Sequence, residues 1–385
     1  MKILMVSVFS NHFFNWVLQL EEAGHDVYWF DVNDANTYVQ RIDFVKQTVK
    51  WKRKYDYPGR YWIKNNFSLL DTFVNKFNQR KFIQVFNQKL EEIRPDVVQS
   101  FEMHSACVPI FEIMKKHPKI SWVYSAWGND LFYYQREPEK LRGMKAVFDR
   151  LDYMFADCSR DFKIAQEYGF TGGYLGTFPT GGGYELHSTN SWINKFQNRK
   201  TILIKGYQHK FGRCNNVLEA LLEIEDEIKD FKIIVFAATE EVLKFVNHPR
   251  FNKMKNLSIV GSIGRGEVLE LMGESLICIG NSISDGMPNT LLETIIMESF
   301  PIQSNPGGAT AEIIEHGKNG YLIENPENSE EIAVLIKKAI QNLNLLKSGI
   351  EYNTKYIKPK LEREYVKEQV LKSYAVVEGK PKIIV

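Results

Sequence analysis

The sequence predicts an α/β protein made of two consecutive units in which strands and helices alternate, and three observations lead to this prediction. First, 385 residues are more than one ordinary hydrophobic core holds, because domains commonly contain about 150 residues. Second, a strand–helix–strand pattern opens the chain, and a similar pattern starts again near residue 200. Third, residues 172–197 between the two units contain three consecutive glycines at 181–183, which is typical of a linker.

The first unit opens with a buried apolar strand at residues 3–8. A helix follows at 15–23, and Gly24 is the kind of residue at which helices end. We expect further strands of this unit at 25–30, 96–100, 120–125 and 153–156. The first domain is therefore placed at residues 1–175 and the linker at 176–199.

The second unit repeats the alternation of apolar strands with amphipathic helices. We expect its strands at 201–205, 232–237, 257–260, 276–280 and 301–304, and its helices at 215–228, 240–247 and 291–299. This second domain is placed at residues 200–358. A last helix is expected at 361–377, within a final segment at 359–385.

The overall composition excludes several classes of protein. The chain has 49 basic and 47 acidic residues, so no global positive field points to nucleic acid. Its four cysteines stand far apart without zinc-ligand spacing, which indicates reduced core cysteines and no metal site. The apolar run at the N-terminus is too short for a signal peptide, and no run approaches the roughly 20 residues that span a bilayer. We therefore expect a cytoplasmic protein.

A basic aromatic segment at residues 41–82 stands out from this balance. Cations such as Lys50, Lys52, Arg53 and Lys54 are interleaved there with tryptophan, tyrosine and phenylalanine. One interpretation is a solvated helix pair with a single packed face. The other is a surface for anionic lipid or for a pyrophosphate-bearing acceptor, which would make the protein peripheral at the inner membrane face. Binding of single-stranded RNA ranks lower, because no nucleic-acid module surrounds the segment.

The most informative stretch runs from residue 281 to 293. A buried strand ends at Gly280, a polar turn follows, and a helix begins near Asn289 or Thr290. Loops at the carboxyl ends of parallel strands bind ligands, and the free N–H groups at a helix start favour an anion such as a diphosphate. Asp285 in the turn and Glu293 in the helix can accept hydrogen bonds from the hydroxyls of a sugar and a ribose.

These residues resemble the Glu-x7-Glu motif of the retaining family 4 glycosyltransferases, here in the form Asp285-x7-Glu293. The sequence at residues 300–323, with its Gly-Gly turn, Glu-Ile-Ile helix and Gly-Lys-Asn-Gly turn, resembles the same family. The likeness is strong from about residue 200 to 325 and weaker before that. It implies a GT-B fold, in which two Rossmann-like domains face each other across a cleft and the last helix crosses back onto the first domain.

The resemblance also implies roles for individual residues. Glu293 would bind the ribose hydroxyls, and Asp285 together with Gly286 would lie at the donor sugar. The backbone amides of Asn289 and Thr290 would meet the distal phosphate. The alternatives are a surface glutamate and a turn-capping aspartate.

Three cations follow the first strand of the second unit. A transferase without a metal needs fixed cations to stabilise the departing diphosphate, and arginine suits phosphate because it binds in a bidentate manner. Arg213 and Lys205 are the predicted catalytic cations, and Lys210 ranks third; ordinary surface cations are the alternative. No Asp-x-Asp pair lies in a suitable loop, which is consistent with a reaction that needs no divalent metal.

The first unit offers weaker candidates. Its first strand is followed by Ser-Asn-His, not by a Gly-x-Gly-x-x-Gly loop, which argues against a dinucleotide-dependent dehydrogenase. His104 follows the strand expected at 96–100, and Asp130 ends the segment Trp127-Gly-Asn-Asp130, which resembles a His-Gly-Ser-Asp segment of the family. Both residues are candidates to contact the acceptor or sugar, with purely structural roles as the alternative.

The predicted function is therefore the transfer of a sugar, with retention of configuration, from a nucleotide-diphosphate-sugar to a glycan or lipid-linked acceptor in cell-surface polysaccharide synthesis. No cofactor is expected beyond the nucleotide-sugar substrate. Two alternatives stay open: a GT-B nucleotide-sugar epimerase, which would consume donor without acceptor, and a non-catalytic sugar-nucleotide-binding protein.

Overall fold

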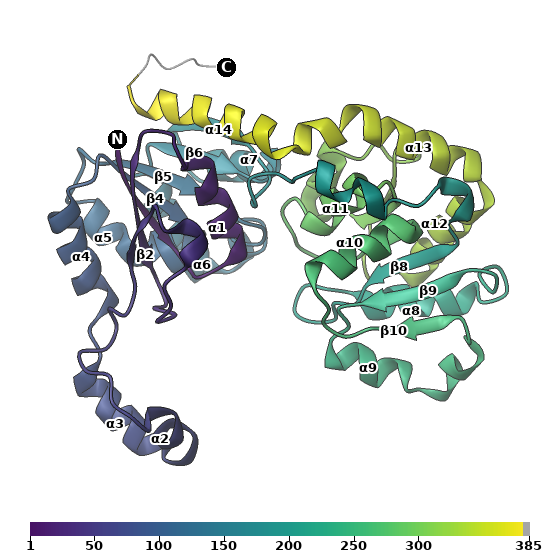
Figure 1. Cartoon of the computed structure of the whole chain (residues 1–385), viewed down its shortest axis with the longest axis horizontal. Coiled ribbons are helices and arrows are strands. Elements are labelled where there is room, and N and C mark those ends of the chain that lie inside the picture. Colours follow the sequence, from purple (N-terminus) through teal and green to yellow (C-terminus); the bar gives the residue numbers. More distant parts are fainter. Residues whose placement is uncertain (380–385) are drawn as a thin grey trace.

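The computed structural model describes residues 1–379, apart from the side chain of Tyr61. It consists of two α/β lobes, each built on a parallel sheet with helices on its faces (Figure 1). The predicted fold class, two Rossmann-like domains with a cleft between them, is confirmed.

The N-terminal lobe contains a seven-stranded sheet in the order β3-β2-β1-β4-β5-β6-β7. All its neighbouring strands pair in parallel, and the strand order reverses between β1 and β4. The strands are β1 Lys2–Ser7, β2 Asp26–Asp31, β3 Lys46–Thr48, β4 Val97–Phe101, β5 Ser121–Ser125, β6 Tyr153–Ala156 and β7 Gly173–Thr177. The helices are α1 Asn11–Val17, α2 Arg60–Asn66, α3 Ser68–Asn78, α4 Phe82–Ile93, α5 Phe111–Met114, α6 Pro138–Phe148 and α7 Ser159–Glu167.

The C-terminal lobe repeats this plan with six parallel strands in the order β10-β9-β8-β11-β12-β13. Here the order reverses between β8 and β11. The strands are β8 Thr201–Lys205, β9 Lys232–Phe236, β10 Leu257–Ile259, β11 Ser275–Gly280, β12 Phe300–Ser304 and β13 Tyr321–Ile323. The helices are α8 Cys214–Glu223, α9 Glu240–Val246, α10 Arg265–Glu274, α11 Asn289–Ile296, α12 Ser329–Gln341 and α13 Leu343–Tyr356.

Burial on both faces characterises the central strands of the two sheets. Every residue of β4, β11 and β12 is buried, as expected for parallel strands covered by helices on both faces. Each sheet separates two apolar clusters, so each lobe has its own core. The lobes therefore resemble independent domains joined by a few crossing segments.

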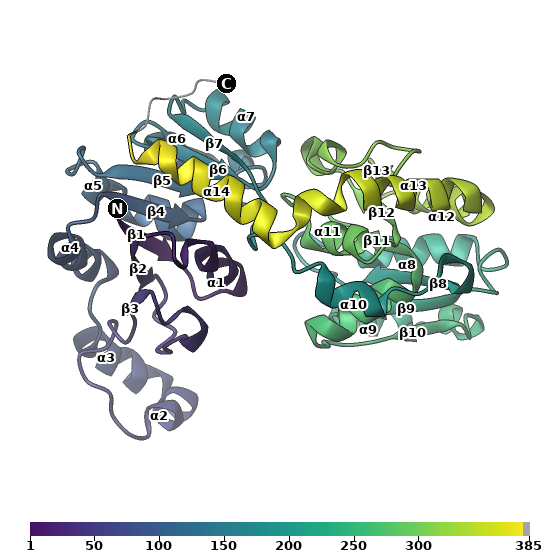
Figure 2. The same ribbon diagram turned by 45° about the horizontal axis from the view of Figure 1, so that its top comes forward.

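The last helix, α14 Arg363–Val377, crosses back onto the N-terminal lobe (Figures 1 and 2). The Tyr374 hydroxyl lies in the core beside β4, where it donates to Gln99 Oε1 and accepts from the Trp16 indole N–H at 3.3 Å. The expected crossover helix is thus confirmed. The linker runs beside it: Tyr184 N–H donates to Leu361 O, and Arg363 N–H donates to Tyr184 O, each at 2.9 Å.

Strand β7 and helix α1 are among the elements that differ from the sequence prediction. β7 extends the N-terminal sheet to Thr177, two residues into the predicted linker. Its glycines are required by packing, since a Cβ on Gly173 would lie 2.8 Å from the Tyr153 ring, so this glycine-rich sequence is a strand and not a flexible connection. Helix α1 begins at Asn11, four residues earlier than predicted, because the Ser10 hydroxyl accepts from Phe13 N–H and caps it.

In residues 1–379, none of the helices combines the length and the apolar character that crossing a lipid bilayer requires.

Helices α2 and α3 lie within the basic aromatic segment. They project from the N-terminal lobe, on the side of the molecule opposite α14 in Figure 1.

Candidate functional site

A cavity of about 770 Å³ lies between the two lobes. Its walls come from the loops that follow the carboxyl ends of strands in both sheets, the edge at which open parallel sheets bind ligands. Charged and polar side chains that line it are His12, Asn129, Asp157, Lys205, Arg265, Asp285 and Glu293.

Helix α11 points its N-terminus into this cavity. Its N-cap is Pro288, which supplies no side-chain hydrogen bond to the first turn. Within residues 1–379, the backbone N–H groups of Asn289 and Thr290 have no hydrogen-bonded acceptor, although both residues line the cavity. Tyr184 from the linker donates its hydroxyl to Asn289 Oδ1 at 2.9 Å and holds this helix start in place. The site is therefore arranged to accept an anion.

Lys205 supplies a positive charge beside that helix start. It ends strand β8, lines the cavity, and places its ammonium 4.5 Å from the centre of the Tyr207 ring. Among the described residues no ion pair neutralises it. Burial raises the pKa of Asp285, and the nearby Lys205 ammonium opposes that rise. A diphosphate in the cavity would meet both this cation and the amides of α11.

Glu293 lies one turn into α11 and also lines the cavity. Its Oε1 accepts from Arg265 Nε at 3.0 Å, and Arg265 is more than half exposed. Glu293 is itself only 14% exposed, but because its partner Arg265 faces solvent, that side chain can move away and leave the carboxylate to ligand hydroxyls. Sequence reasoning missed Arg265, although its position directly after the strand expected at 257–260 was a usable signal.

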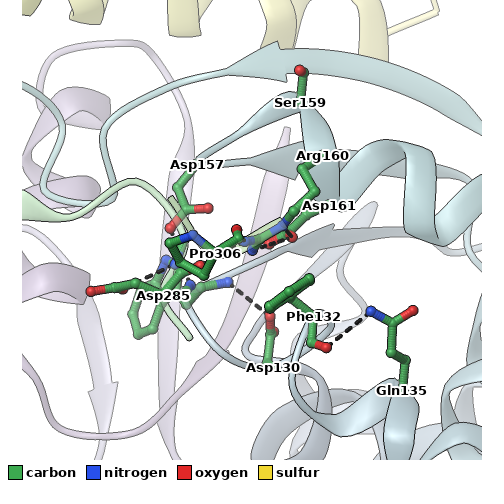
Figure 3. Close-up of polar contacts among 12 residues, drawn as sticks. Asp130, Phe132, Gln135, Asp157, Ser159, Arg160, Asp161, Asp285 and Pro306 are labelled. Atoms are coloured by element: carbon green, nitrogen blue, oxygen red, sulfur yellow. Dashed lines mark hydrogen bonds and ion pairs between the residues drawn. The ribbon is translucent and has the colours of Figure 1, made fainter. Parts of the chain in front are cut away.

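The turn that carries Asp285 is held by the other lobe. Arg160, in the first turn of α7, donates from Nη1 to the carbonyl of Asp285 at 2.8 Å and to that of Pro306 at 2.7 Å, as seen in Figure 3. A Cβ added to Gly286 would lie 2.2 Å from Asp157 Oδ2, so only glycine allows this close approach. Asp285 and Gly286 thus sit at the junction between the lobes.

A second contact secures the same junction. The Glu312 carboxylate, from the C-terminal lobe, accepts from the N–H groups of Ser159 and Arg160 at 2.8 and 2.9 Å. It therefore caps the N-terminus of α7, a helix of the opposite lobe. We call the set Ser159, Arg160, Asp285, Pro306 and Glu312 the interlobe seam.

Three buried residues with side chains of the kind that bind metal ions lie close together near the seam. Asp157, Cys158 and Asp161 lie close enough to share a cation. That position already has one, because Arg160 binds Asp161 Oδ1 through Nε at 2.9 Å and through Nη2 at 2.7 Å. The group is accordingly explained as a buried ion pair with a thiol beside it.

Burial raises the pKa of Asp157 to about 7, with the charge of Asp161 contributing further. The folded chain therefore holds this proton up to about pH 7, whereas an unfolded aspartate releases it near pH 4. Between these values the folded state binds more protons, so the free energy of unfolding falls as the pH rises.

We expect Asp157→Asn to remove this loss of stability. The thermal unfolding midpoint of the variant, relative to that of the wild type, should rise from pH 5 to pH 8, by an amount equivalent to at most about 3 kcal/mol. The exposed Asp149→Asn variant controls for the simple loss of a charge. A difference between variant and wild type that is the same at both pH values would contradict the prediction.

The structure does not bring Arg213 or Lys210 into the cavity. The Arg213 guanidinium is bound by Glu327 Oε1 at 2.8 Å and by backbone carbonyls of its own loop, including that of Gly212 at 2.9 Å. Lys210 pairs with Glu137 at 3.7 Å and covers the Tyr133 ring at the rim of the lobes. The sequence placed all three cations in one loop, but only Lys205 extends toward the cavity, because the loop folds Arg213 back on itself.

His104 and Asp130 make contacts within the N-terminal lobe. His104 Nε2 bonds the carbonyl of Asp130 at 3.0 Å, and its ring packs against Tyr134, which lines the cavity. Asp130 contributes to the cavity wall, but its carboxylate accepts from Met103 N–H, Trp127 N–H and the Tyr124 hydroxyl. Of the alternatives that the sequence left open, these contacts support the structural one for both residues.

Several polar atoms near the cavity lack partners. Asn129 Oδ1, Asp157 Oδ1 and Ser284 Oγ are buried without a hydrogen bond among the described residues. Asn129 and Asp157 line the main cavity, and Ser284 lines an adjoining one of about 170 Å³. Such unpaired polar atoms are available to hydrogen-bond a ligand or water in the cavity. No sequence signal marked them, since their isolation results from tertiary packing.

His12 is a further residue that the sequence did not assign. It lies in the first turn of α1 and lines the cavity opposite Glu293. Desolvation by the surrounding walls lowers the pKa of His12, although Glu293 and Asp285 partly oppose this. Its ring is therefore neutral at pH 7 and can hydrogen-bond a bound sugar. The sequence signal that could have identified His12 was its position in the loop after the first strand.

Residues 189–356 match the family model described as Glycosyl transferases group 1. The matched segment includes Lys205, the start of α11 and Glu293, which form the anion-binding side of the cavity. The matched residues cover the C-terminal lobe, from just before β8 to the end of α13. None of the curated protein sequences compared matches the chain.

Solved glycosyltransferases share the whole two-lobed arrangement with this chain. Sucrose-phosphate synthase from Thermosynechococcus elongatus superposes with a TM-score of 0.72 at 13% identity, over 98% of this chain and 99% of that one. HepE from Anabaena, in complex with UDP-glucose, gives 0.69 at 12% identity over 98% and 100%. A UDP-forming α,α-trehalose-phosphate synthase from Burkholderia xenovorans gives 0.66 at 12% identity over 98% and 99%. The C-terminal lobe is therefore one half of a GT-B fold.

Proposed function

We propose that the whole chain is a glycosyltransferase that moves a sugar from a nucleoside-diphosphate sugar to a hydroxyl of a glycan or lipid-linked acceptor, with retention of configuration and without a divalent metal. The observation that carries the proposal is the pairing of Lys205 with the free amides of Asn289 and Thr290 in one interlobe cavity. These groups provide fixed positive charge at the place where a departing diphosphate develops negative charge.

The proposed mechanism assigns the donor to the C-terminal lobe. The bond between the sugar's anomeric carbon and the diphosphate breaks, the acceptor oxygen attacks from the same face, and its proton passes to the leaving phosphate oxygen. Lys205 and the α11 amides stabilise the leaving group, and Glu293 holds the ribose. Asp285, Asn129 and Ser284 are the candidates to position sugar hydroxyls. Closure of the lobes excludes water and limits donor hydrolysis.

A screen of nucleotide-sugars by thermal shift tests the first step. UDP-sugars are the first to try, because HepE is seen with UDP-glucose and another structural neighbour is UDP-forming. Saturation at 100 times Kd should stabilise the chain by about 2.7 kcal/mol. Retention would then be checked by NMR of the product's anomeric configuration. Stabilisation by none of the UDP-, GDP- or ADP-sugars would refute the proposal.

The same assay separates the proposed activity from its alternatives. Consumption of donor without any acceptor would identify an epimerase, and binding without turnover would identify a sugar-nucleotide-binding protein. Sugar phosphates belong among the acceptors, because two of the structural neighbours are named as synthases of sugar phosphates. We favour a lipid-linked glycan at the cytoplasmic membrane face because of the basic aromatic segment.

Glu293→Ala should weaken nucleotide-sugar binding about 10- to 100-fold, because hydrogen bonds from ribose hydroxyls to a carboxylate contribute about 1.5–3 kcal/mol. Isothermal titration with the donor identified in the screen measures the change in Kd. Glu270→Ala, an exposed glutamate on the neighbouring helix α10, is the matched control and should bind as the wild type does. Equal Kd values for both variants would remove Glu293 from the site.

A further inference from the structure

The α2–α3 hairpin, residues 52–80, is an anchored projection of the N-terminal lobe (Figures 1 and 2). Its neck is closed by two backbone hydrogen bonds, Lys54 N–H to Asn78 O at 2.8 Å and Arg80 N–H to Lys52 O at 2.7 Å. Just before the neck, the buried Trp51 donates its indole N–H to Asp31 O at 2.7 Å. The hairpin is therefore held in a defined direction.

This projection exposes an unusual concentration of large apolar side chains. Leu69 is 86% exposed and Tyr55 is 77% exposed. The aromatic rings contact mainly one another: Trp62 lies 5.3 Å from Phe67, and Phe73 lies 5.3 Å from Phe77. Apolar surface gathered in this way, and not scattered singly, marks an interaction site. The exposed members are Tyr55, Trp62, Phe67, Leu69, Leu70, Phe73 and Phe77.

The charge of the same segment is strongly positive. Residues 50–81 contain nine basic and two acidic residues, whereas the whole chain has a formal net charge of only +2. Lysines and arginines that border an apolar helix face can keep their charged ends in water while their stems follow the apolar surface. Apolar rings rimmed by cations are typical of helices that lie in the interface of an anionic bilayer.

We propose that the α2–α3 hairpin docks on an anionic lipid bilayer, with its aromatic and leucine side chains entering the boundary between headgroups and acyl chains. The flanking lysines and arginines bind the lipid phosphates. A second copy of the chain fits this surface poorly, because two such hairpins would bring together a large excess of like charge. A bilayer supplies both the apolar interior and the opposite charge.

The position of the hairpin relates docking to the cleft. The hairpin follows β3, and because the sheet is parallel, it leaves from the sheet edge whose loops line the interlobe cavity. Docking therefore turns this edge of the N-terminal lobe toward the lipid. A lipid-linked acceptor would then enter the cavity from the membrane. This consequence rests on the proposed function, whereas the docking of the hairpin does not depend on it.

Vesicle flotation of the full chain tests the proposal. We expect the protein to float with phosphatidylcholine–phosphatidylglycerol vesicles and to float much less with phosphatidylcholine alone. The triple variant Leu69→Ser, Phe73→Ser, Phe77→Ser should lose at least about tenfold in partitioning, because each removes apolar area that would enter the bilayer. Neutralising Lys50, Lys52, Arg53 and Lys54 to glutamine should lose at least as much.

Matched controls lie on the C-terminal lobe. Leu343→Ser with Tyr356→Ser removes comparably exposed apolar groups, and Lys253→Gln with Lys255→Gln removes exposed cations. Both control variants should float as the wild type does. No flotation of the wild type, or equal losses in hairpin and control variants, would overturn the proposal. So would light scattering that showed a dimer which the apolar hairpin variant dissociates.

Donor binding distinguishes this inference from the proposed function. The hairpin variants should show the wild-type thermal shift with nucleotide-sugars, because their residues lie outside the cavity. Flotation that persists while no nucleotide-sugar binds would leave docking supported and the transferase proposal refuted. Donor turnover without flotation would support the transferase proposal and refute docking.

Discussion

Lys205→Ala is expected to lower kcat about 10²- to 10³-fold, with a smaller change in KM. Lys205, at the end of β8, lines the same cavity as the free amides of α11 and forms no ion pair with a described carboxylate. Removing one preorganised donor from a site of developing negative charge commonly lowers the rate by that factor. Steady-state kinetics with the donor identified by the thermal screen measures the effect.

Arg213→Ala is the matched comparison for Lys205→Ala, because Lys205 ends β8 and Arg213 closes the loop that follows it, directly before α8. The Arg213 side chain binds Glu327 and its own loop, so its removal should change kcat by no more than a few-fold. A larger loss for Arg213→Ala than for Lys205→Ala would mean that the loop rearranges when donor binds. It would also refute the assignment of the leaving-group cation to Lys205.

Arg160→Met should reduce both stability and turnover. The fully buried Asp161 would lose its bidentate partner, and breaking a buried ion pair in this way costs about 3–5 kcal/mol, or a thermal midpoint lower by at least about 6 °C for a lobe of this size. The carbonyls of Asp285 and Pro306 would lose their donor from the other lobe at the same time. Turnover should therefore fall because the turn carrying Asp285 is released.

Arg150→Met separates these two effects. Arg150 is also mostly buried, but it binds Asp152 and the carbonyls of Met114, His117 and Ile120, all within the N-terminal lobe. It should lower the thermal midpoint without opening the lobes. Small-angle scattering should then show a larger radius of gyration for Arg160→Met alone. Equal radii and equal turnover in the two variants would confine Arg160 to a stabilising role.

Much of the fold could be predicted because burial leaves a direct trace in the sequence. Strands β6 and β8 were predicted residue for residue, and β4 and β11 within one residue, since each is short, rich in apolar residues and bounded by polar or turn residues. The strands that were missed, β3, β7 and β13, are short or rich in glycine and polar residues. Pairing with a neighbouring strand supplies what their own sequences do not indicate.

The candidate site could be predicted only where local structure and position coincide. A strand, a turn and a helix start are contiguous at residues 275–296, so the sequence located the α11 terminus and Glu293. The sequence does not predict in which direction a long side chain extends. Lys205 and Arg213 both qualified by composition, yet loop carbonyls and Glu327 decided which of them extends into the cavity.

By itself, the sequence determined the two units of alternating strands and helices and the anion-binding helix start, because each depends on apolar periodicity or on backbone groups that are near in the chain. The crossover of the last helix was implied by the family resemblance. Only the tertiary structure decided the seam at Arg160 and Glu312, the orphaned oxygen atoms of Asn129 and Asp157, and the projection of the α2–α3 hairpin. These features join groups more than 100 residues apart or depend on which surfaces stay uncovered. Neither condition leaves a periodic signal in the chain, since both arise only when the lobes pack together.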